Sequence, residues 1–269
     1  MTADFADKAA DALLQIRHKK PLVHHITNWV TISDCASITR SLGALPVMAH
    51  AEEEVEEMTG IAGALVLNIG TLTPTLVRSM IKAGKQANRK GTPVILDAVG
   101  AGATGLRTDS AKKILAEVKI GVIKGNSGEI ATLAGARAEV KGVESISVEG
   151  DPAVYARALA KAEGCTVVVT GAEDIITDGS RLLLVMNGHP RMGDVVGTGC
   201  MAASVIGAFS AVESDRTLAA AFAMTVYGIA GETAAKDARG PGSMKQNLFD
   251  SIMAIGPDEV RKGAKVDAA

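Results

Sequence analysis

A glycine-rich turn in the C-terminal third of the chain has the residue types of an anion-binding site. It runs from Met192 to Ala203 (MGDVVGTGCMAA) and passes directly into small and apolar residues of helical character. Glycines let the backbone approach a phosphate, and a helix beginning near Gly199 points its unpaired N–H groups and positive dipole end at the turn. The sequence therefore predicts anion binding over Gly197 and Gly199, with Cys200 at the helix start.

Polar residues also follow several short apolar runs that read as strands. Asp97 follows 93–96, Lys124 and Asn126 with Glu129 follow 120–123, and Thr170 follows 166–169. Ligands of open α/β sheets bind at the carboxyl ends of strands, so we expect these side chains to converge with the glycine turn. Acids for a metal, a cation and an anion turn suit phosphoryl transfer from a nucleotide, in which positioning and charge neutralisation supply most of the acceleration.

Each of these residues also has a simpler structural interpretation. Asp97 fits a turn cap, Glu129 a solvated acid in a first helical turn, Lys124 a solvated loop cation, and Thr170 a hydroxyl bonded to its own backbone. A lone cysteine among Gly, Ala and Met, such as Cys200, is typical of a small buried apolar residue. Residue types and spacing alone leave these alternatives open.

The elements that must position these residues alternate along the chain. Apolar runs at 64–68, 93–96, 120–123 and 166–169 alternate with helical patterns at 73–88, 108–118 and 127–133. This alternation predicts an α/β fold with a doubly wound, mainly parallel sheet flanked by helices. Two further runs, 173–177 and 181–186 around a turn at 178–180, predict an antiparallel edge. Helical patterns continue through 219–235 and 243–255, and we expect the polar tail from Lys262 to be frayed.

Composition narrows the class of protein. The chain has 269 residues, 47% of them hydrophobic, and no proline- or serine-rich linker, which favours a single domain over 1–269. A net charge of −2 gives no electrostatic footprint for nucleic acid or a membrane surface, so we expect a small-molecule partner. The first residues lack an apolar signal and no apolar run reaches the roughly 18 residues needed to span a bilayer, which predicts a cytoplasmic location. The three widely spaced cysteines are expected to be free thiols.

Five segments together resemble one known family. They are HITN at 25–28, GALPVMAH at 43–50, LNIGTL at 67–72, LDAVGAGAT at 96–104 and GTGC at 197–200. In order and spacing they resemble the hydroxyethylthiazole kinases. The resemblance implies a ribokinase-like fold, a homotrimer with active sites at subunit boundaries, and ATP-dependent phosphorylation of 4-methyl-5-(2-hydroxyethyl)thiazole in thiamine salvage.

The same resemblance assigns roles to individual positions. It implies that Asn28 and Met48 line the thiazole pocket with Gly197, and that Cys200 faces the substrate hydroxyl. It further implies ATP contacts for the residues after two strands, Lys124, Asn126 and Thr170, and Mg²⁺ with its waters held by the two acids, Asp97 and Glu129. The N–H groups around Gly197 and Gly199 would hold the charge of the transferring phosphoryl group.

A cysteine at the expected base position is unusual. An unperturbed thiol has a pKa near about 8.5, and a helix N-terminus can lower it. A loose transition state in which the hydroxyl proton leaves late needs no strong base, so Cys200 is expected to assist modestly or to orient the alcohol.

The chain also departs from the family pattern at three places. Ser33 and Ser37 replace the two asparagines of the usual NTTAN segment, and Asp34 adds a carboxylate near the expected pocket. Ala98 replaces the usual proline after Asp97, which predicts a more mobile backbone there. Lys124 replaces the arginine of many members, which predicts a point-charge contact in place of a two-pronged one.

Other functions remain open at this stage. A hydroxymethylpyrimidine kinase or an ATP-using NAD(P)HX dehydratase would share the fold, but each should carry aspartate where Cys200 stands. A sensor of thiazole or nucleotide on the same scaffold would tolerate loss of part of the site, whereas Asp97, Asn126, Glu129 and the glycine turn are all present.

Overall fold

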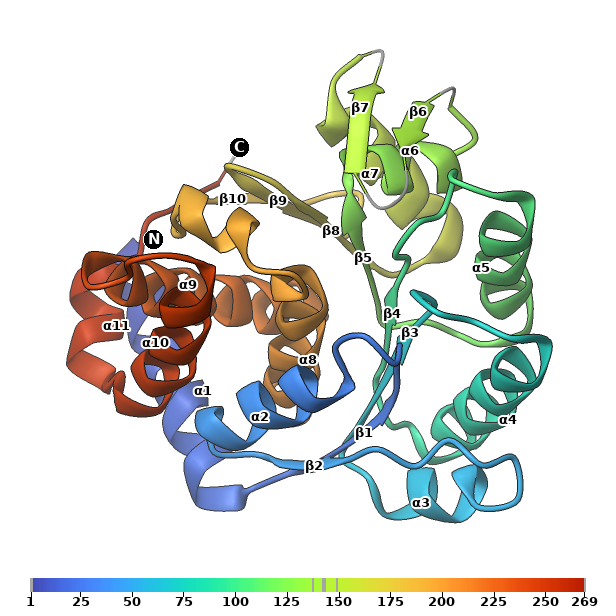
Figure 1. The fold of residues 1–269 in the computed structure, drawn as a ribbon, viewed down its shortest axis with the longest axis horizontal. Coiled ribbons are helices and arrows are strands. Elements are labelled where there is room, and N and C mark those ends of the chain that lie inside the picture. Colours follow the sequence, from blue (N-terminus) through green and yellow to red (C-terminus); the bar gives the residue numbers. More distant parts are fainter. Residues whose placement is uncertain (1, 137, 142–143, 149, 269) are drawn as a thin grey trace.

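A nine-stranded sheet forms the centre of the protein, with helices on both of its faces (Figure 1). The computed structural model describes residues 2–136, 138–141, 144–148 and 150–268. The strand order across the sheet is β11-β10-β9-β8-β5-β4-β3-β1-β2. The strands are β1 (Leu22–Ile26), β2 (Leu45–Val47), β3 (Ala64–Asn68), β4 (Val94–Asp97), β5 (Val122–Asn126), β8 (Thr166–Thr170), β9 (Asp174–Thr177), β10 (Leu182–Val185) and β11 (Val266–Ala268). The predicted α/β class with an antiparallel edge is confirmed.

Two groups of helices cover the two faces. One face carries α1 (Thr2–Lys19), α2 (Ile32–Leu42), α8 (Thr198–Ser210), α9 (Arg216–Lys236), α10 (Pro241–Ala254) and α11 (Pro257–Gly263). The other carries α3 (Val55–Ile61), α4 (Pro74–Lys90), α5 (Gly105–Glu117), α6 (Ser127–Leu133) and α7 (Pro152–Glu163). A short 3₁₀ helix, η1 (Pro190–Asp194), precedes α8. Both faces of the parallel strands are therefore buried, as their continuous apolar sequences require.

The register of the parallel strands aligns the polar residues that end them. Asn68 of β3 lies opposite Asp97 of β4, and Asp97 lies opposite Lys124 of β5. Asn126, at the end of β5, lies opposite Thr170 of β8. Side chains from four separate strands thus meet at one edge of the sheet.

The antiparallel edge extends farther than the sequence indicates. β9 pairs with β8 and β10, and the final strand β11 pairs with β10 through Val185 and Val266. The expectation of a frayed tail from Lys262 is wrong, because α11 continues to Gly263 and β11 covers the edge of β10. Val266 is buried there, and this burial anchors a segment that is otherwise polar.

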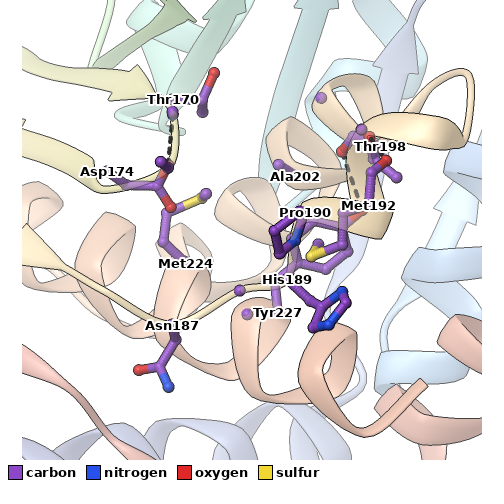
Figure 2. Close-up of a pocket in the computed structure, with 16 residues that line it drawn as sticks. Thr170, Asp174, Asn187, His189, Pro190, Met192, Thr198, Ala202, Met224 and Tyr227 are labelled. Carbon is purple, nitrogen blue, oxygen red and sulfur yellow. Dashed lines mark hydrogen bonds between the residues drawn. The ribbon is translucent and has the colours of Figure 1, made fainter. Parts of the chain in front are cut away.

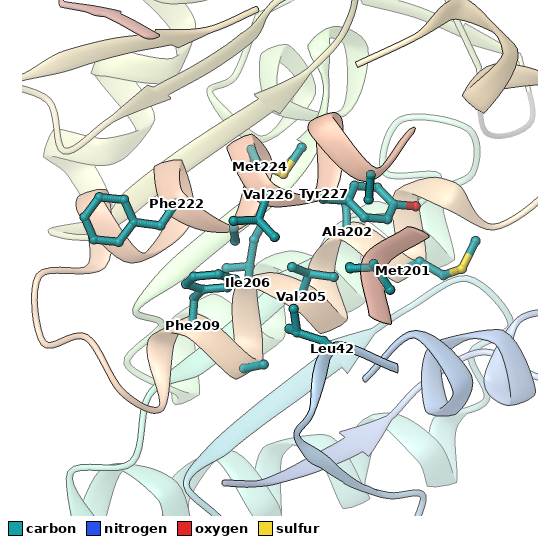
Figure 3. Packing of buried hydrophobic residues seen from close by; sticks show 14 of the residues in the cluster. Leu42, Met201, Ala202, Val205, Ile206, Phe209, Phe222, Met224, Val226 and Tyr227 are labelled. Carbon is teal, nitrogen blue, oxygen red and sulfur yellow. The ribbon is translucent and has the colours of Figure 1, made fainter. Parts of the chain in front are cut away.

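Helix α8 reaches the site because it packs closely on the sheet. Its residues and those of α9 form a large part of the larger apolar core, in which Phe209, Val205 and Phe222 are fully buried (Figure 3). Gly207 permits the close approach, since a Cβ atom there would lie 2.6 Å from Cγ2 of Val66 in β3. The packing of α8 therefore fixes where its N-terminus lies.

Within the described part of the chain, α9 is the one helix long and apolar enough to cross a membrane. In the structure 83% of its apolar window is buried inside the protein. The hydrophobicity of α9 is thus used in the core of the fold.

A small hairpin stands apart from the main sheet. It consists of β6 (Ala138–Lys141) and β7 (Glu144–Val148), which pair antiparallel and project beyond α6 (Figure 1). The sequence analysis assigned no element to this segment.

Candidate active site

Helix α8 begins directly after the glycine turn, as the sequence predicts. Gly197 adopts a left-handed conformation with φ of 96°, and its carbonyl accepts the first helical hydrogen bond from Met201 N at 2.8 Å. A Cβ atom at Gly197 would lie 2.5 Å from Cγ2 of Thr31, so both backbone conformation and space require glycine. Thr198 N donates to Val195 O at 3.4 Å, and the other N–H groups at the start of α8 have no carbonyl of the preceding helical turn to bond.

A buried chain of hydrogen bonds runs beside this helix start and crosses the ends of four strands. Asn28 Nδ2 donates to Asn68 Oδ1 at 2.9 Å, and Asn68 Nδ2 donates to Asp97 Oδ2 at 2.6 Å. Lys124 Nζ donates to the other carboxylate oxygen, Asp97 Oδ1, at 3.0 Å. None of these side chains is more than 4% exposed, so the chain is rigidly held in a low-dielectric environment.

The Asp97–Lys124 pair sits underneath the glycine turn. A Cβ atom at Gly199 would lie 3.1 Å from Lys124 Nζ, so the ammonium lies against the first turn of α8. Burial lowers the pKa of Lys124, but the negative charges of Asp97 and Glu129 outweigh it, and the net shift is upward. Burial raises the pKa of Asp97, and the Lys124 cation opposes that rise. Lys124 is therefore a permanent buried cation and not the solvated loop residue of the simpler interpretation.

Cys200 joins the same network through Asn28. Asn28 Nδ2 donates to Cys200 Sγ at 3.3 Å, and the thiol is buried. Burial and then the charge of Asp97 raise its pKa, and the Lys124 cation only partly opposes them. A helix N-terminus can lower the pKa of a thiol, but loss of hydration dominates at this buried position. Cys200 is a neutral thiol in this environment.

Glu129 and Asn126 hold the start of α6 in a reciprocal cap. Asn126 Oδ1 accepts from Glu129 N at 2.9 Å, while Glu129 Oε2 accepts from Asn126 N at 2.7 Å. The second carboxylate oxygen of Glu129 accepts from Gly100 N at 2.7 Å. Glu129 is 3% exposed and burial raises its pKa, so it is not the solvated first-turn acid of the alternative interpretation.

The buried acids of the site outnumber its buried lysine, which favours the binding of a cation. Among the described residues, the buried acids are Asp97, Glu129 and Asp174, and Lys124 is the buried lysine. No group of three or more His, Cys, Asp or Glu in the described ranges could hold a metal by itself. An excess of buried carboxylates without a full ligand set suits Mg²⁺, which binds through one or two carboxylates together with phosphates and water.

Ala98 ties the loop after Asp97 to the neighbouring strand. Its N–H donates to the carbonyl of Lys124 at 2.9 Å, and its own carbonyl accepts from Ala101 N at 2.9 Å. These two hydrogen bonds restrain the loop, and its greater mobility relative to a proline-containing loop stays a prediction. Proline has no N–H to make the first bond, so alanine adds a hydrogen bond at the point where proline would add stiffness.

A cavity of about 480 Å³ opens on the other side of the α8 start (Figure 2). Its wall combines Thr198, Gly199 and Ala202 of α8 with residues from the β8–β9 turn, the segment after β10, and α9. The apolar part of the wall includes Pro190, Met192, Met224 and Tyr227. A cavity with an apolar wall that ends at a helix N-terminus suits a flat ring with a phosphate tail.

Of the residues predicted to bind ATP, one lines the cavity and two lie beside it. Thr170 lines the cavity, and its hydroxyl donates to Gly125 O of the neighbouring strand at 3.4 Å. Lys124 and Asn126 lie at the strand ends beside the cavity and outside its wall. Met48, which was predicted to line the thiazole pocket, lies farther out. It is half-buried after the edge strand β2, and its carbonyl accepts from His50 Nδ1.

The loop after β1 forms the rim of the site on the Asn28 side. Trp29 is 49% exposed and its ring meets that of His50 edge-on, with the centroids 4.7 Å apart. Asp34, the carboxylate that departs from the family pattern, is paired with Lys245 of α10 at 2.8 Å. A Cβ atom at Gly197 would lie 3.9 Å from Asp34 Oδ2, so this ion pair stands beside the glycine turn.

The sequence analysis missed two residues that the structure makes central. Asn68 connects Asn28 to Asp97, and it carried the same signal as Asp97, a polar residue ending an apolar strand. Asp174 lines the cavity from the start of β9, and a lone acid opening a strand gave no signal. The histidines His24 and His25 are buried and hydrogen-bonded within the core, which fits a structural role.

Comparison with known proteins agrees with this geometry. The sequence pattern of the Hydroxyethylthiazole kinase family matches residues 13–258. A hydroxyethylthiazole kinase of Methanosarcina mazei is 56% identical over 255 residues, which cover 95% of this chain and 98% of that protein. One from Thermoanaerobacter pseudethanolicus is 58% identical, with 94% and 96% covered.

Solved structures with a similar fold include a protein of the same name. The hydroxyethylthiazole kinase protein of Pyrococcus horikoshii OT3 superposes with a TM-score of 0.90 at 44% identity, covering 97% of this chain and 99% of that one. A pyridoxal kinase from Staphylococcus aureus, at 14% identity and a TM-score of 0.64, shares the fold. On the family match and the identity of its relatives, the chain belongs to the hydroxyethylthiazole kinase family.

Proposed function

We propose that this enzyme transfers the γ-phosphoryl group of ATP to the hydroxyl of 4-methyl-5-(2-hydroxyethyl)thiazole, a step of thiamine salvage. The observation that carries the proposal is the buried chain from Asn28 through Asn68 and Asp97 to Lys124, which lies against the N-terminus of α8. Relatives at 52–58% identity over nearly the whole chain bear the name of this kinase. The two alternative enzymes, a hydroxymethylpyrimidine kinase and an NAD(P)HX dehydratase, should carry aspartate where Cys200 stands and have no such support.

The geometry supports a division of labour in the reaction. The alcohol oxygen attacks the γ-phosphorus in line, and the first N–H groups of α8, from Gly197 to Cys200, bind the charge that spreads over the transferring oxygens. Lys124 adds a fixed positive charge directly behind Gly199. These groups are already in position before the reaction, so the transition state needs no reorganisation of the protein.

The acceptor side is organised by Asn28, Met48 and Cys200. Asn28 is held by three hydrogen bonds to its Oδ1, from Val30 N, Thr31 N and the Thr31 hydroxyl. Its Nδ2 orients Cys200 Sγ, and the neutral thiol orients the alcohol beside the glycine turn without removing its proton early. Met48, half-buried after β2, closes the outer side of the thiazole pocket.

Asp97 and Glu129 would hold Mg²⁺ and its waters, and Mg²⁺ bound there would neutralise charge on the leaving diphosphate. The nucleotide itself occupies the 480 Å³ cavity, with Thr170 and Asn126 on the side of its phosphates. The excess of buried carboxylates over buried lysine supports this arrangement.

We further propose that residues 1–269 act as one cytoplasmic domain and assemble as a homotrimer, with active sites at the subunit boundaries. Exposed apolar side chains at the rim support an interface there: Trp29 is 49%, Val30 66% and Val196 72% exposed. Sedimentation equilibrium of the purified protein measures its mass. A single species of monomer mass at micromolar concentration would contradict the trimer.

ADP release with ATP, Mg²⁺ and the thiazole alcohol tests the proposed reaction. Parallel assays contain hydroxymethylpyrimidine or no alcohol. Turnover with the thiazole alcohol alone is expected. Turnover that prefers hydroxymethylpyrimidine would assign the chain to a different acceptor, and folded protein that binds ATP without turnover of either alcohol would favour the sensor or the dehydratase.

A further inference from the structure

One acid in the wall of the cavity beside α8 has a carboxylate oxygen that accepts no hydrogen bond from the described residues. Asp174 is 6% exposed, and its Oδ1 accepts from Gly171 N at 3.0 Å, which closes the turn between β8 and β9. Within the described residues, its Oδ2 takes no hydrogen bond. The side chain lines the cavity next to Met224 (Figure 2). Asp174 Oδ2 is therefore an acceptor that remains available to a hydrogen-bond donor on a molecule in the cavity.

The other polar side chains of the cavity wall are committed to the protein. Asn187 donates to Glu232 Oε1 and Gly263 O and accepts from Lys265 N, so both amide N–H groups and one acceptor site of its oxygen are used within the protein. The other polar wall residues bond to the backbone. The hydroxyl groups of three of them donate to carbonyl oxygens: Thr170 to Gly125 O, Thr198 to Met192 O and Tyr227 to Thr198 O. His189 Nδ1 accepts from Arg191 N. Among the described residues of this wall, Asp174 is the buried acid, and its Oδ2 is a carboxylate acceptor without a hydrogen bond to the protein.

The order of the strands says which part of a nucleotide meets Asp174. In the proposed reaction, phosphoryl transfer takes place beside Asp97 on β4 and Lys124 on β5, and β8 and β9 follow in order across the sheet. Because β9 runs antiparallel to β8, its first residue lies at the same edge as Thr170, the last residue of β8. The phosphates therefore lie at β5 and β8, and the sugar follows at β9, while the apolar side chains of Pro190, Met192 and Met224 suit the base.

We infer that Asp174 Oδ2 accepts a hydrogen bond from a ribose hydroxyl of the bound nucleotide, and that this contact selects ribonucleotides over deoxyribonucleotides. The inference rests on the proposed use of ATP. Burial raises the pKa of Asp174 to about 7, so the carboxylate form is substantially populated at pH 7.5 and above. An ionised acceptor in a dry pocket forms a strong hydrogen bond with a hydroxyl donor.

Substitution Asp174→Asn separates the ligand contact from the structural one. The amide oxygen of asparagine still accepts from Gly171 N, while the group at the Oδ2 position changes from an acceptor to a donor. The matched control is Asp178→Asn, in the turn between β9 and β10 at the opposite end of β9. There Asp178 Oδ1 accepts from Ser180 N and Arg181 N, and it lies outside the cavity.

Calorimetric binding of ATP, 2′-deoxy-ATP, 3′-deoxy-ATP and ITP at pH 8 is the experiment. The parent is expected to bind one deoxynucleotide about tenfold more weakly than ATP. In Asp174→Asn this penalty falls below about threefold, while Asp178→Asn retains it. Melting temperatures confirm that both variants fold.

Three results would overturn the inference, and they are distinguishable from one another. Equal binding of ATP and both deoxynucleotides by the parent excludes a sugar contact. An unchanged deoxynucleotide penalty in Asp174→Asn shows that Asp174 only closes the turn, and a change confined to the ATP-to-ITP ratio shows a base contact. In each of these cases ATP still binds, whereas a parent that binds no ATP contradicts the proposed function as well.

Discussion

At the scale of single residues, the site depends on amides and a lysine as much as on acids. Asn28 and Asn68 fix the positions of Cys200 and Asp97, and Lys124 compensates the charge of Asp97. Asp97, Lys124 and Cys200 could be selected from the sequence because each follows an apolar run or lies at the start of a helix. Their mutual bonding could not, because it depends on strand register, which a list of strands does not contain.

Two substitutions at Cys200 test its role. Cys200→Ala is expected to keep measurable activity, with a loss of kcat smaller than about 100-fold, because a neutral thiol contributes less than a true general base. Cys200→Asp is expected to match or exceed the parent, since a carboxylate accepts the hydroxyl proton more readily. Steady-state kinetics with the thiazole alcohol measure both effects. A folded but inactive Cys200→Asp would contradict the second expectation.

The substitution Lys124→Met tests the buried ion pair. It leaves the Asp97 carboxylate without its counter-ion, and we expect a loss of about 3–5 kcal/mol in the free energy of unfolding at pH 8. The double variant Lys124→Met/Asp97→Leu removes both charges and should recover part of this loss. Urea denaturation of the parent, both single variants and the double variant gives the coupling energy. A coupling near zero would show that the two charges do not stabilise one another.

At the scale of elements, the sheet and α8 together define the site. The sequence predicts β3, β4, β5 and β8, the antiparallel hairpin and the helix after the glycine turn, because their apolar runs are continuous and their ends carry clear signals. The sequence does not predict the parallel strands β1 and β2. It does not predict β11, whose three residues are held by pairing with β10 rather than by their own propensity. The cavity wall was equally hidden, because segments from four parts of the chain contribute to it.

The close contact of α8 with β3 can be tested at Gly207. Gly207→Ala is expected to cost about 1–3 kcal/mol of stability and to reduce kcat, because the added methyl meets Val66 and pushes the helix start away from Lys124. The compensating change Val66→Ala makes room for that methyl. The double variant Gly207→Ala/Val66→Ala should therefore regain activity relative to Gly207→Ala in the same assay. No regain would show that α8 tolerates the shift or that another contact, such as Val23, limits it.

At the scale of the whole molecule, the active-site edge lowers the stability that the two apolar cores provide. Asp97, Glu129 and Asp174 are buried acids, and burial raises the pKa of each. An acid with a raised pKa holds its proton more tightly in the folded state than in the unfolded state. It therefore destabilises the fold increasingly as the pH rises, and full destabilisation is reached above the folded-state pKa.

This linkage makes a prediction for Asp174, whose pKa is about 7 in the fold against an ordinary 3.8. Asp174→Asn should leave stability unchanged below pH 4, become relatively more stable as the pH rises from 4 to 7, and gain as much as about 4 kcal/mol above pH 7. Urea denaturation at pH 4, 6 and 8 checks the trend. A constant difference between variant and parent across this range would show that Asp174 titrates normally.

The chain has a single tryptophan, Trp29, and it stands at the rim of the site with its ring against His50. Because Trp29 is half exposed and directly follows Asn28, its fluorescence depends on what covers this rim. The apolar core contains no indole, so the emission maximum gives little information about core packing. The protein therefore carries a built-in optical reporter: a blue shift on adding the thiazole alcohol would follow acceptor binding in real time, separately from nucleotide binding.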